Sequence, residues 1–436
     1  MLVSQSSPYP SNADAAASER ALLERRARLL GPTYRAFYRN PIHLVRGSGV
    51  WLYDAQGRKF LDAYNNVASV GHCHPRVVEA LSGQAATLNT HTRYLSEIIL
   101  DYAEKLLGTV PAHLSHAMFT CTGSEANDLA IRIAQHSSGG TGVIITDFAY
   151  HGATIATAQL SPAAVGAKGV RAQHRTVSAP DTFRDHGRAA NVFAKNVAAA
   201  IEDMRVKDIK PAALLLDSAF SSDGIFFPDA AVMREAVDHV RKAGGIVIAD
   251  EVQSGFGRLG QGMWGFANYG IEPDIVTMGK PIGDGHPMGA VLVRPQLVAS
   301  FGSNTGYFNT FGGNPVAAAV GLAVLAVIEG EGLIENARNV GAYTSELLRT
   351  LQSRHGAVAD IRHNGLYFGV ELTADGDEAL AATKTSAVVE AMREDGVLIS
   401  SCGPRGNVLK MRPPLPFARD NAEQLAETLD RALSNW

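Results

Sequence analysis

Two residues that could do chemistry together each follow a short apolar run. Lys280 stands between a glycine and a proline just after residues 275–278, so we expect it in a loop at the end of a buried strand. Asp250 directly follows residues 245–249, a second buried-strand run. A loop lysine alone is most often a solvated surface residue. A lysine and a carboxylate at neighbouring strand ends, however, suit pyridoxal phosphate chemistry, in which the lysine forms a Schiff base and the acid keeps the ring nitrogen protonated.

A third strand end has the residues of a phosphate site. Residues 117–120 are predicted to form a strand, and a helix is expected from the following Gly-Ser pair to Gln135. Gly123 lets the backbone approach an anion closely, and Ser124 suits the N-cap of the helix. Free N–H groups and the helix dipole then favour a bound phosphate, although many helices begin this way with no ligand.

The strand of residues 142–146 and the strand of residues 213–216 also end near polar or aromatic residues. Tyr150 follows the first and could lie flat on a planar cofactor, although ordinary packing is the commoner role of such a tyrosine. Asp217 ends the second. Helical segments separate these strands, which predicts an α/β domain with a mostly parallel sheet.

Two motifs are set aside. Residues 255–260 match G-x-G-x-x-G, but no helical pattern follows them, as a dinucleotide site requires. His72 and His74 have no third ligand at metal spacing, so we expect loop histidines and no metal site.

The bulk properties are those of a water-soluble protein of 436 residues with two or three domains. A net charge of -4 predicts neither nucleic-acid nor membrane-surface binding. The three cysteines have no metal-ligand spacing and point to a reducing, cytoplasmic location. The longest apolar run, residues 316–328, is shorter than the ~20 residues of a membrane span.

We predict three segments along the chain. Residues 1–75 would form an arm to about residue 15, a helix at 19–30 and a hairpin around residues 54–57. Residues 76–325 would form the large cofactor-binding domain. Residues 326–436 would complete a small α+β domain with the N-terminal segment, with strands at 366–372, 397–400 and 407–412 and a final helix capped by Asp420.

Five motifs in order resemble the class III, fold-type-I PLP-dependent aminotransferases over nearly the whole chain. They are TGSEAN at 122–127, YHG at 150–152, DEVQSGFGR at 250–258, GKPIG at 279–283 and TFGGNP at 310–315. The resemblance implies a large domain with a mixed, mostly parallel sheet of the seven-stranded type and an α+β small domain. It also implies a homodimer with shared active sites.

The resemblance further implies a role for each matching residue. Lys280 would be the Schiff-base lysine and general base, and Asp250 would hold the ring nitrogen. The other cofactor-binding residues would be Gln253 at the ring hydroxyl, Val252 and Tyr150 on the two ring faces with His151 beside them, Gly123 and Ser124 at the phosphate, and Thr310 from the second subunit.

The chain departs from the family pattern near its C-terminus. Many members have an arginine that binds a substrate carboxylate three residues before a Pro-Pro pair, and here that position is Lys410. Lysine cannot form the bidentate pair that arginine makes with a carboxylate. Strand alternation puts Lys410 and Arg412 on one face, where they could bind a compact dianion; a solvated pair on an edge strand is the alternative.

This pattern is similar to the branch of phospho-lyases that act on O-phosphoethanolamine or phosphohydroxylysine. VASVGHCHP at 67–75, TMGKPIGDGHP at 277–287 and YFNTFGG at 307–313 also resemble that branch. The resemblance implies β-elimination of phosphate from a small phosphorylated amine, with Lys410, Arg412 and Tyr150 at the substrate. The alternatives are an ω-aminotransferase using pyruvate or 2-oxoglutarate, a 5-phosphohydroxylysine phospho-lyase, or a binding protein without activity.

Overall fold

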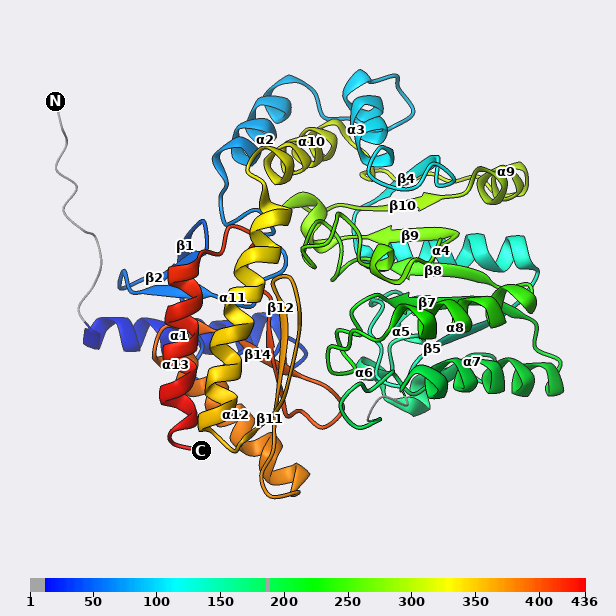
Figure 1. Cartoon of the computed structure of the whole chain (residues 1–436). Helices are drawn as coiled ribbons and strands as arrows, with labels where there is room; N and C mark the ends of the chain where they lie inside the picture. Colours follow the sequence, from blue (N-terminus) through cyan, green and yellow to red (C-terminus); the bar gives the residue numbers. More distant parts are fainter. Residues whose placement is uncertain (1–11, 186–188) are drawn as a thin grey trace.

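A seven-stranded sheet forms one half of the molecule, and the smaller sheets with helices α11 (Leu333–Arg354) and α13 (Arg419–Leu433) form the other half (Figure 1). The computed structural model describes residues 12–185 and 189–436. The strand order is β4-β10-β9-β8-β7-β5-β6. Their bounds are β4 His116–Thr120, β10 Gly289–Val293, β9 Ile275–Met278, β8 Ile246–Asp250, β7 Pro211–Asp217, β5 Gly142–Thr146 and β6 Arg175–Val177. Only β10 runs antiparallel to its neighbours, so the predicted mixed and mostly parallel sheet is confirmed.

Helices cover both faces of this sheet because its strands are apolar on both sides (Figure 1). On one face, Ile145 and Leu215 pack with α4 (Gly123–Ser138) and α9 (Pro295–Asn304). On the other, Leu214 and Val247 pack with α7 (Ala189–Val206) and α8 (Ala230–Lys242). Alternate residues of each strand therefore belong to different cores, and all the strands are held in register by two packed layers.

Two smaller four-stranded sheets join distant parts of the chain. The first has the order β1-β2-β3-β13, where β1 is Leu44–Ser48, β2 Trp51–Asp54, β3 Lys59–Asp62 and β13 Val397–Leu398. The second has the order β11-β12-β15-β14, where β11 is Val358–Asn364, β12 Tyr367–Leu372, β15 Val408–Met411 and β14 Ser400–Cys402. The predicted N-terminal hairpin is β2 and β3. The pairing of β3 with β13 places the N-terminal segment beside the C-terminal one.

The remaining helices surround these sheets. They are α1 Asn12–Leu30, α2 Pro75–Thr87, α3 Glu97–Leu107, α5 Ile155–Ala158, α6 Pro162–Val165, α10 Pro315–Gly330, α11 Leu333–Arg354, α12 Glu378–Glu394 and α13 Arg419–Leu433, with short 3-10 turns η1 Ala167–Gly169, η2 Gly265–Tyr269 and η3 Lys280–Gly283. The buried helix α10 packs on α2 and α3. In the described chain no single helix is long and apolar enough to cross a membrane; only α10 and α11 taken together pass that test, and they bend by 57°. The predicted domain limits at residues 75 and 325 stay a prediction.

The structure corrects several predicted boundaries. The helix predicted at residues 19–30 already begins at Asn12, so the arm is shorter than expected; residues 1–11 of that arm lie outside the described residues. The strand predicted at residues 397–400 divides into β13 and β14, which belong to different sheets. The last strand ends at Met411, before the Pro-Pro pair.

Three local predictions about caps and loops were also wrong. Thr122, not Ser124, is the N-cap of α4, because its side chain accepts a hydrogen bond from Glu125 N. Asp420 does not cap the final helix, which begins one residue earlier with Asn421 Oδ1 accepting from Ala418 N. Lys280 opens a single 3-10 turn in place of an irregular loop.

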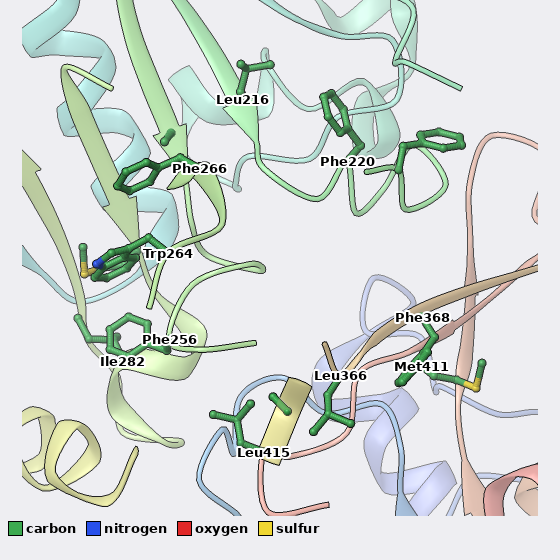
Figure 2. Close-up of a cluster of buried hydrophobic side chains, with 14 of the residues drawn as sticks. Leu216, Phe220, Phe256, Trp264, Phe266, Ile282, Leu366, Phe368, Met411 and Leu415 are labelled. Carbon is green, nitrogen blue, oxygen red and sulfur yellow. The ribbon is translucent and has the colours of Figure 1, made fainter. Parts of the chain in front are cut away.

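One hydrophobic core connects the large sheet to the C-terminal sheet. Figure 2 shows Leu216 and Phe220 near the end of β7 and, across from them, Phe368 and Met411 of β12 and β15. Phe368 and Met411 are paired across the two strands, so their side chains share a face. Because neighbours along a strand alternate, Lys410 must point to the opposite face.

Candidate active site

A cavity of about 290 Å³ lies at the carboxyl ends of the central strands, the usual binding edge of an open α/β sheet. Eight predicted residues line it together: Gly123, Ser124, Tyr150, His151, Asp250, Val252, Gln253 and Lys280. They come from four separate segments that follow β4, β5, β8 and β9. The sheet therefore brings together the residues that the sequence singled out.

Asp250 is buried at the end of β8 and is held from several sides. Asn127 Nδ2 donates to its Oδ2 over 2.7 Å, and His151 Nδ1 lies 2.8 Å from the same oxygen. Val252 N donates to Oδ1 over 3.1 Å. An ionised carboxylate accepts about four hydrogen bonds. Asp250 therefore has capacity for one more donor, as a protonated ring nitrogen would provide.

Asn127 and Thr277 are functional candidates that sequence reasoning did not single out. Thr277 Oγ1 donates to Asn127 Oδ1 over 2.6 Å, which fixes the amide so that its Nδ2 faces Asp250. Both residues are buried. The available signal was the place of Asn127 one helical turn after Gly123, on the same face of α4.

The start of α4 forms a cradle for an anion. A Cβ on Gly123 would lie 2.8 Å from Val252 Cγ2, and one on Gly152 would lie 2.7 Å from Ser124 Oγ. Ser124 Oγ accepts a hydrogen bond from Ala153 N, so its own proton is free to donate. With the first N–H groups of a 16-residue helix beside it, this space suits a phosphate group.

Lys280 reaches the same cavity with a free amine. Its Nζ makes no hydrogen bond or ion pair with any residue that the structure describes. Burial is the main cause that lowers its pKa, and the nearby Arg412 lowers that pKa further. A larger neutral fraction makes the amine a better nucleophile and base.

His151, Tyr150, Val252 and Gln253 complete the wall. His151 Nε2 is buried and lacks a hydrogen-bond partner among the described residues, which leaves a polar atom available at this site. Tyr150 is partly exposed and Val252 is buried. Gln253 Oε1 already accepts a hydrogen bond from Arg412 Nη1. Its predicted role at a ring hydroxyl therefore requires the Gln253 amide to bind Arg412 and the hydroxyl at the same time.

Behind this wall lie three buried cations without an acidic partner. The exposed fractions are 1% for Arg258, 6% for Lys410 and 5% for Arg412. Lys410 Nζ donates to Ser221 O over 2.8 Å. Arg412 donates to Tyr64 O and Gln253 Oε1, and Arg258 donates to Asn66 Oδ1 and to the carbonyls of Leu366 and Pro413. Within the described ranges, none of the three forms an ion pair with a carboxylate.

A neighbouring buried cation shows the ordinary arrangement. Arg362 Nη1 lies 2.8 Å from Glu371 Oε2 and 2.7 Å from Asp360 Oδ2. Buried charges are normally paired in this way, because an unpaired one costs several kcal/mol. The three cations are instead held by neutral oxygens, which leaves a positive charge that an anion could compensate. Lys410 and Arg412 do not line the main cavity, and the alternative of a solvated pair at a strand edge is wrong.

The other predicted residues lie outside this cluster. Thr310 is exposed and does not line the cavity of its own chain, so its contribution to a partner's site stays a prediction. His72 lies 2.7 Å from Asp62 and His74 lies 3.0 Å from Glu331, as expected of loop histidines. No group of three potential metal ligands occurs in residues 12–185 and 189–436.

The chain is similar to proteins of two named activities. It is 37% identical to the Caenorhabditis elegans ethanolamine-phosphate phospho-lyase homolog 1, covering 96% of this chain and 94% of that protein. It is 32% identical to human mitochondrial alanine–glyoxylate aminotransferase 2, covering 95% of this chain and 86% of that protein.

The similar solved structures also include both a phospholyase and a transaminase. An Arthrobacter phospholyase in complex with phosphoethanolamine has a TM-score of 0.91 and 43% identity, over 95% of this chain and 100% of that one. A Thermomicrobium roseum omega-transaminase has a TM-score of 0.84 and 28% identity, over 98% of this chain and 99% of that one. The expected fold-type-I architecture is thereby confirmed. The family model for class III aminotransferases matches residues 34–433, and the chain belongs to this family.

Proposed function

We propose that this protein is a PLP-dependent phospho-lyase that eliminates phosphate from O-phosphoethanolamine or a similar small phosphorylated amine. The observation that carries the proposal is the set of unpaired buried cations, Arg258, Lys410 and Arg412, directly behind the cavity wall. A phosphate dianion would compensate their charge. A phosphate-free amine would leave them unpaired.

The solved structures support this choice over a plain aminotransferase. The 43% identical Arthrobacter structure is called a phospholyase and was solved with phosphoethanolamine, whereas the omega-transaminase structure is only 28% identical. Identity to the curated relatives does not separate the two activities, because an Arabidopsis thaliana alanine–glyoxylate aminotransferase 2 homolog, at 39%, is as similar as the phospho-lyase homolog, at 37%.

The cavity residues fit pyridoxal phosphate. Gly123 and Ser124 would hold its phosphate at the start of α4, and Asp250 would accept the hydrogen bond of its ring nitrogen. When bound, the cofactor supplies an electron sink that stabilises negative charge on the substrate carbon next to nitrogen. Asn127 and His151 position Asp250 for this contact.

The protein's own groups would then move the proton and accept the leaving group. Lys280 Nζ removes a proton from Cα of the substrate, as its lowered pKa favours. The Cβ–O bond breaks and its electron pair leaves with the phosphate, where Lys410 and Arg412 stabilise the growing charge. The remaining unsaturated amine takes up water and gives acetaldehyde and ammonia, so no second substrate is needed.

An ω-aminotransferase is the second candidate, favoured by the named activity of many relatives. It would share the proton removal by Lys280 but would require a keto acid to complete its cycle. Incubation with O-phosphoethanolamine, with and without pyruvate, separates the two. We expect the same rate of phosphate release in both samples, and a rate that depends strictly on pyruvate would favour the aminotransferase.

The pH dependence should report the charge of Lys410. Burial and the neighbouring Arg412 lower the pKa of Lys410 to about 7. The amine is therefore charged below that pH and loses its proton as the pH rises through it. We expect kcat/KM for O-phosphoethanolamine to fall above pH 7, relative to kcat/KM for a phosphate-free amine. In Lys410→Arg the guanidinium stays charged and this relative fall should disappear; an unchanged profile in that variant would exclude Lys410 as its cause.

We further propose a homodimer in which Thr310 of one subunit binds the cofactor phosphate of the other. Thr310→Ala should then release pyridoxal phosphate faster than the wild type, because a hydrogen bond to a charged group is lost. Thr350→Ala, an exposed threonine on α11, is the matched control. Diluting the protein until the dimer dissociates should also release the cofactor. Sedimentation reports the dissociation, and the absorbance of the cofactor reports its release. A monomer that retains it as tightly as the dimer would contradict the shared site.

A further inference from the structure

Two buried hydroxyl groups beside Lys410 lack hydrogen-bond partners among the described residues. They are Ser221 Oγ and Tyr367 OH, and both side chains are fully buried. Burial raises the pKa of Tyr367, and a side-chain contact with Ser221 within hydrogen-bonding reach lowers it again, but that contact falls outside good hydrogen-bond geometry and neither hydroxyl has another partner among the described residues. A buried hydroxyl without a partner loses the hydrogen bonds it would make to water, so a pair of them needs an explanation.

The fold brings these hydroxyls to the unpaired amine. Gly369 is paired with Lys410 between β12 and β15, so Tyr367, two residues earlier on β12, shares the face of Lys410. The Lys410 Nζ lies 5.8 Å from the centre of the Tyr367 ring. Ser221 accepts from that same Nζ through its carbonyl oxygen. The large residues of the other face, Phe368 and Met411, belong to the hydrophobic cluster (Figure 2).

The donors remain available for a ligand. Lysine has three N–H donors, and the Lys410 ammonium uses one on Ser221 O. The two acids of this loop have other partners: Asp217 accepts from Ala219 N and Ser221 N over 2.9 Å each, and Asp223 accepts from Thr146 Oγ1 and Phe148 N over 2.8 and 3.1 Å. Neither carboxylate forms an ion pair with Lys410. Asp217 also lines the main cavity together with Lys280. The loop from Asp217 to Ser221 therefore joins the cavity wall to the cluster, while Ser221, Tyr367 and Lys410 do not themselves line the cavity.

Unpartnered buried hydroxyls alone do not define a site, because Tyr102 and Ser345 have them too. Those two lie on α3 and α11. Ser221 and Tyr367 differ from them in lying against a buried cation that itself lacks a carboxylate partner. Two hydroxyl donors and an ammonium on one side match a tetrahedral oxyanion, which offers several acceptor oxygens at once.

We propose that Ser221 Oγ, Tyr367 OH and Lys410 Nζ form the subsite that binds the phosphate of the substrate and of the released product. The inference rests on the proposed phospho-lyase function and deepens it by assigning the leaving-group site. Each hydroxyl donates one hydrogen bond to a phosphate oxygen, and Lys410 donates from an N–H group that Ser221 O does not use.

Calorimetric titration of the cofactor-loaded protein with inorganic phosphate tests this subsite, because the cofactor already fills the site at Gly123 and Ser124. We expect Ser221→Ala and Tyr367→Phe each to weaken phosphate binding roughly tenfold or more, since each loses a hydrogen bond to a charged group. KM for O-phosphoethanolamine should rise similarly, while KM for a phosphate-free amine stays constant. The controls Ser345→Ala and Tyr102→Phe, which remove comparable buried hydroxyls elsewhere, should bind phosphate as the wild type does.

The possible results distinguish a failure of the phosphate subsite from a failure of the proposed phospho-lyase function. Phosphate binding by both variants at wild-type strength, or no phosphate binding by the wild type, would overturn the subsite. If the wild type nevertheless releases phosphate from O-phosphoethanolamine without a keto acid, the proposed function survives that result. If it releases none, the proposed function itself fails.

Discussion

Lys280→Ala is expected to lower the rate of phosphate release by about 10⁴-fold, the upper end of what a positioned general base contributes. The reason is that Lys280 follows β9 at the carboxyl-terminal edge of the sheet and extends a free amine into the cavity. The variant should also lose the visible absorbance band of lysine-bound cofactor. Activity measured with a coupled phosphate assay and the absorbance spectrum together provide the check.

The fold of this variant should be intact. Lys280 Nζ makes no hydrogen bond with the residues that the structure describes, so its removal breaks no hydrogen bond, and the thermal unfolding midpoint should stay close to the wild-type value. Lys105→Ala, which removes an exposed lysine paired with Glu329, serves as the matched control and should keep full activity. Substantial phosphate release by Lys280→Ala would remove this lysine from the chemistry.

The second large effect concerns Lys410→Met. Loss of one donor to the departing phosphate should lower kcat/KM for O-phosphoethanolamine by roughly 10²- to 10³-fold, as for other preorganised donors to a developing charge. A phosphate-free amine should lose far less. The measurement is kcat/KM for the two substrates in the same enzyme preparation. Equal losses of kcat/KM for both substrates would show that Lys410 supports the structure of the site and makes no specific contact with the phosphate.

Thermal unfolding of Lys410→Met gives an independent measure of the same idea. Lys410 is buried with a single carbonyl partner, and the burial of its charge is uncompensated in the absence of ligand. A methionine of similar length removes this cost, so the variant should unfold at the same temperature as the wild type or higher. A purely structural lysine would instead destabilise the fold when removed.

The cofactor site could be predicted from sequence because its residues follow strand ends directly. Asp250 ends β8 and Lys280 follows β9 by two residues, and parallel strands bring such ends to one edge. Asn127 was missed for the opposite reason. It sits inside α4, where an amide is an ordinary polar residue, and its partner Asp250 lies 123 positions away in the chain.

The burial of the cations could not be read from the sequence. Strand alternation predicts that Lys410 and Arg412 share a face, but it does not say what covers that face, and β15 itself ends at Met411. The covering loop follows β7, and its Ser221 accepts from Lys410 across 189 positions. Small boundary errors have local causes: Thr122 and Ser124 can both cap a helix, and only the backbone geometry decides between them.

The most direct test of the account is the stoichiometry of the complete reaction without a keto acid. Purified protein loaded with pyridoxal phosphate and given excess O-phosphoethanolamine should release phosphate, ammonia and acetaldehyde in equal amounts over many turnovers per subunit. A reaction that stops after about one turnover, liberates no phosphate and resumes only when pyruvate or 2-oxoglutarate is added would show an aminotransferase and contradict the account.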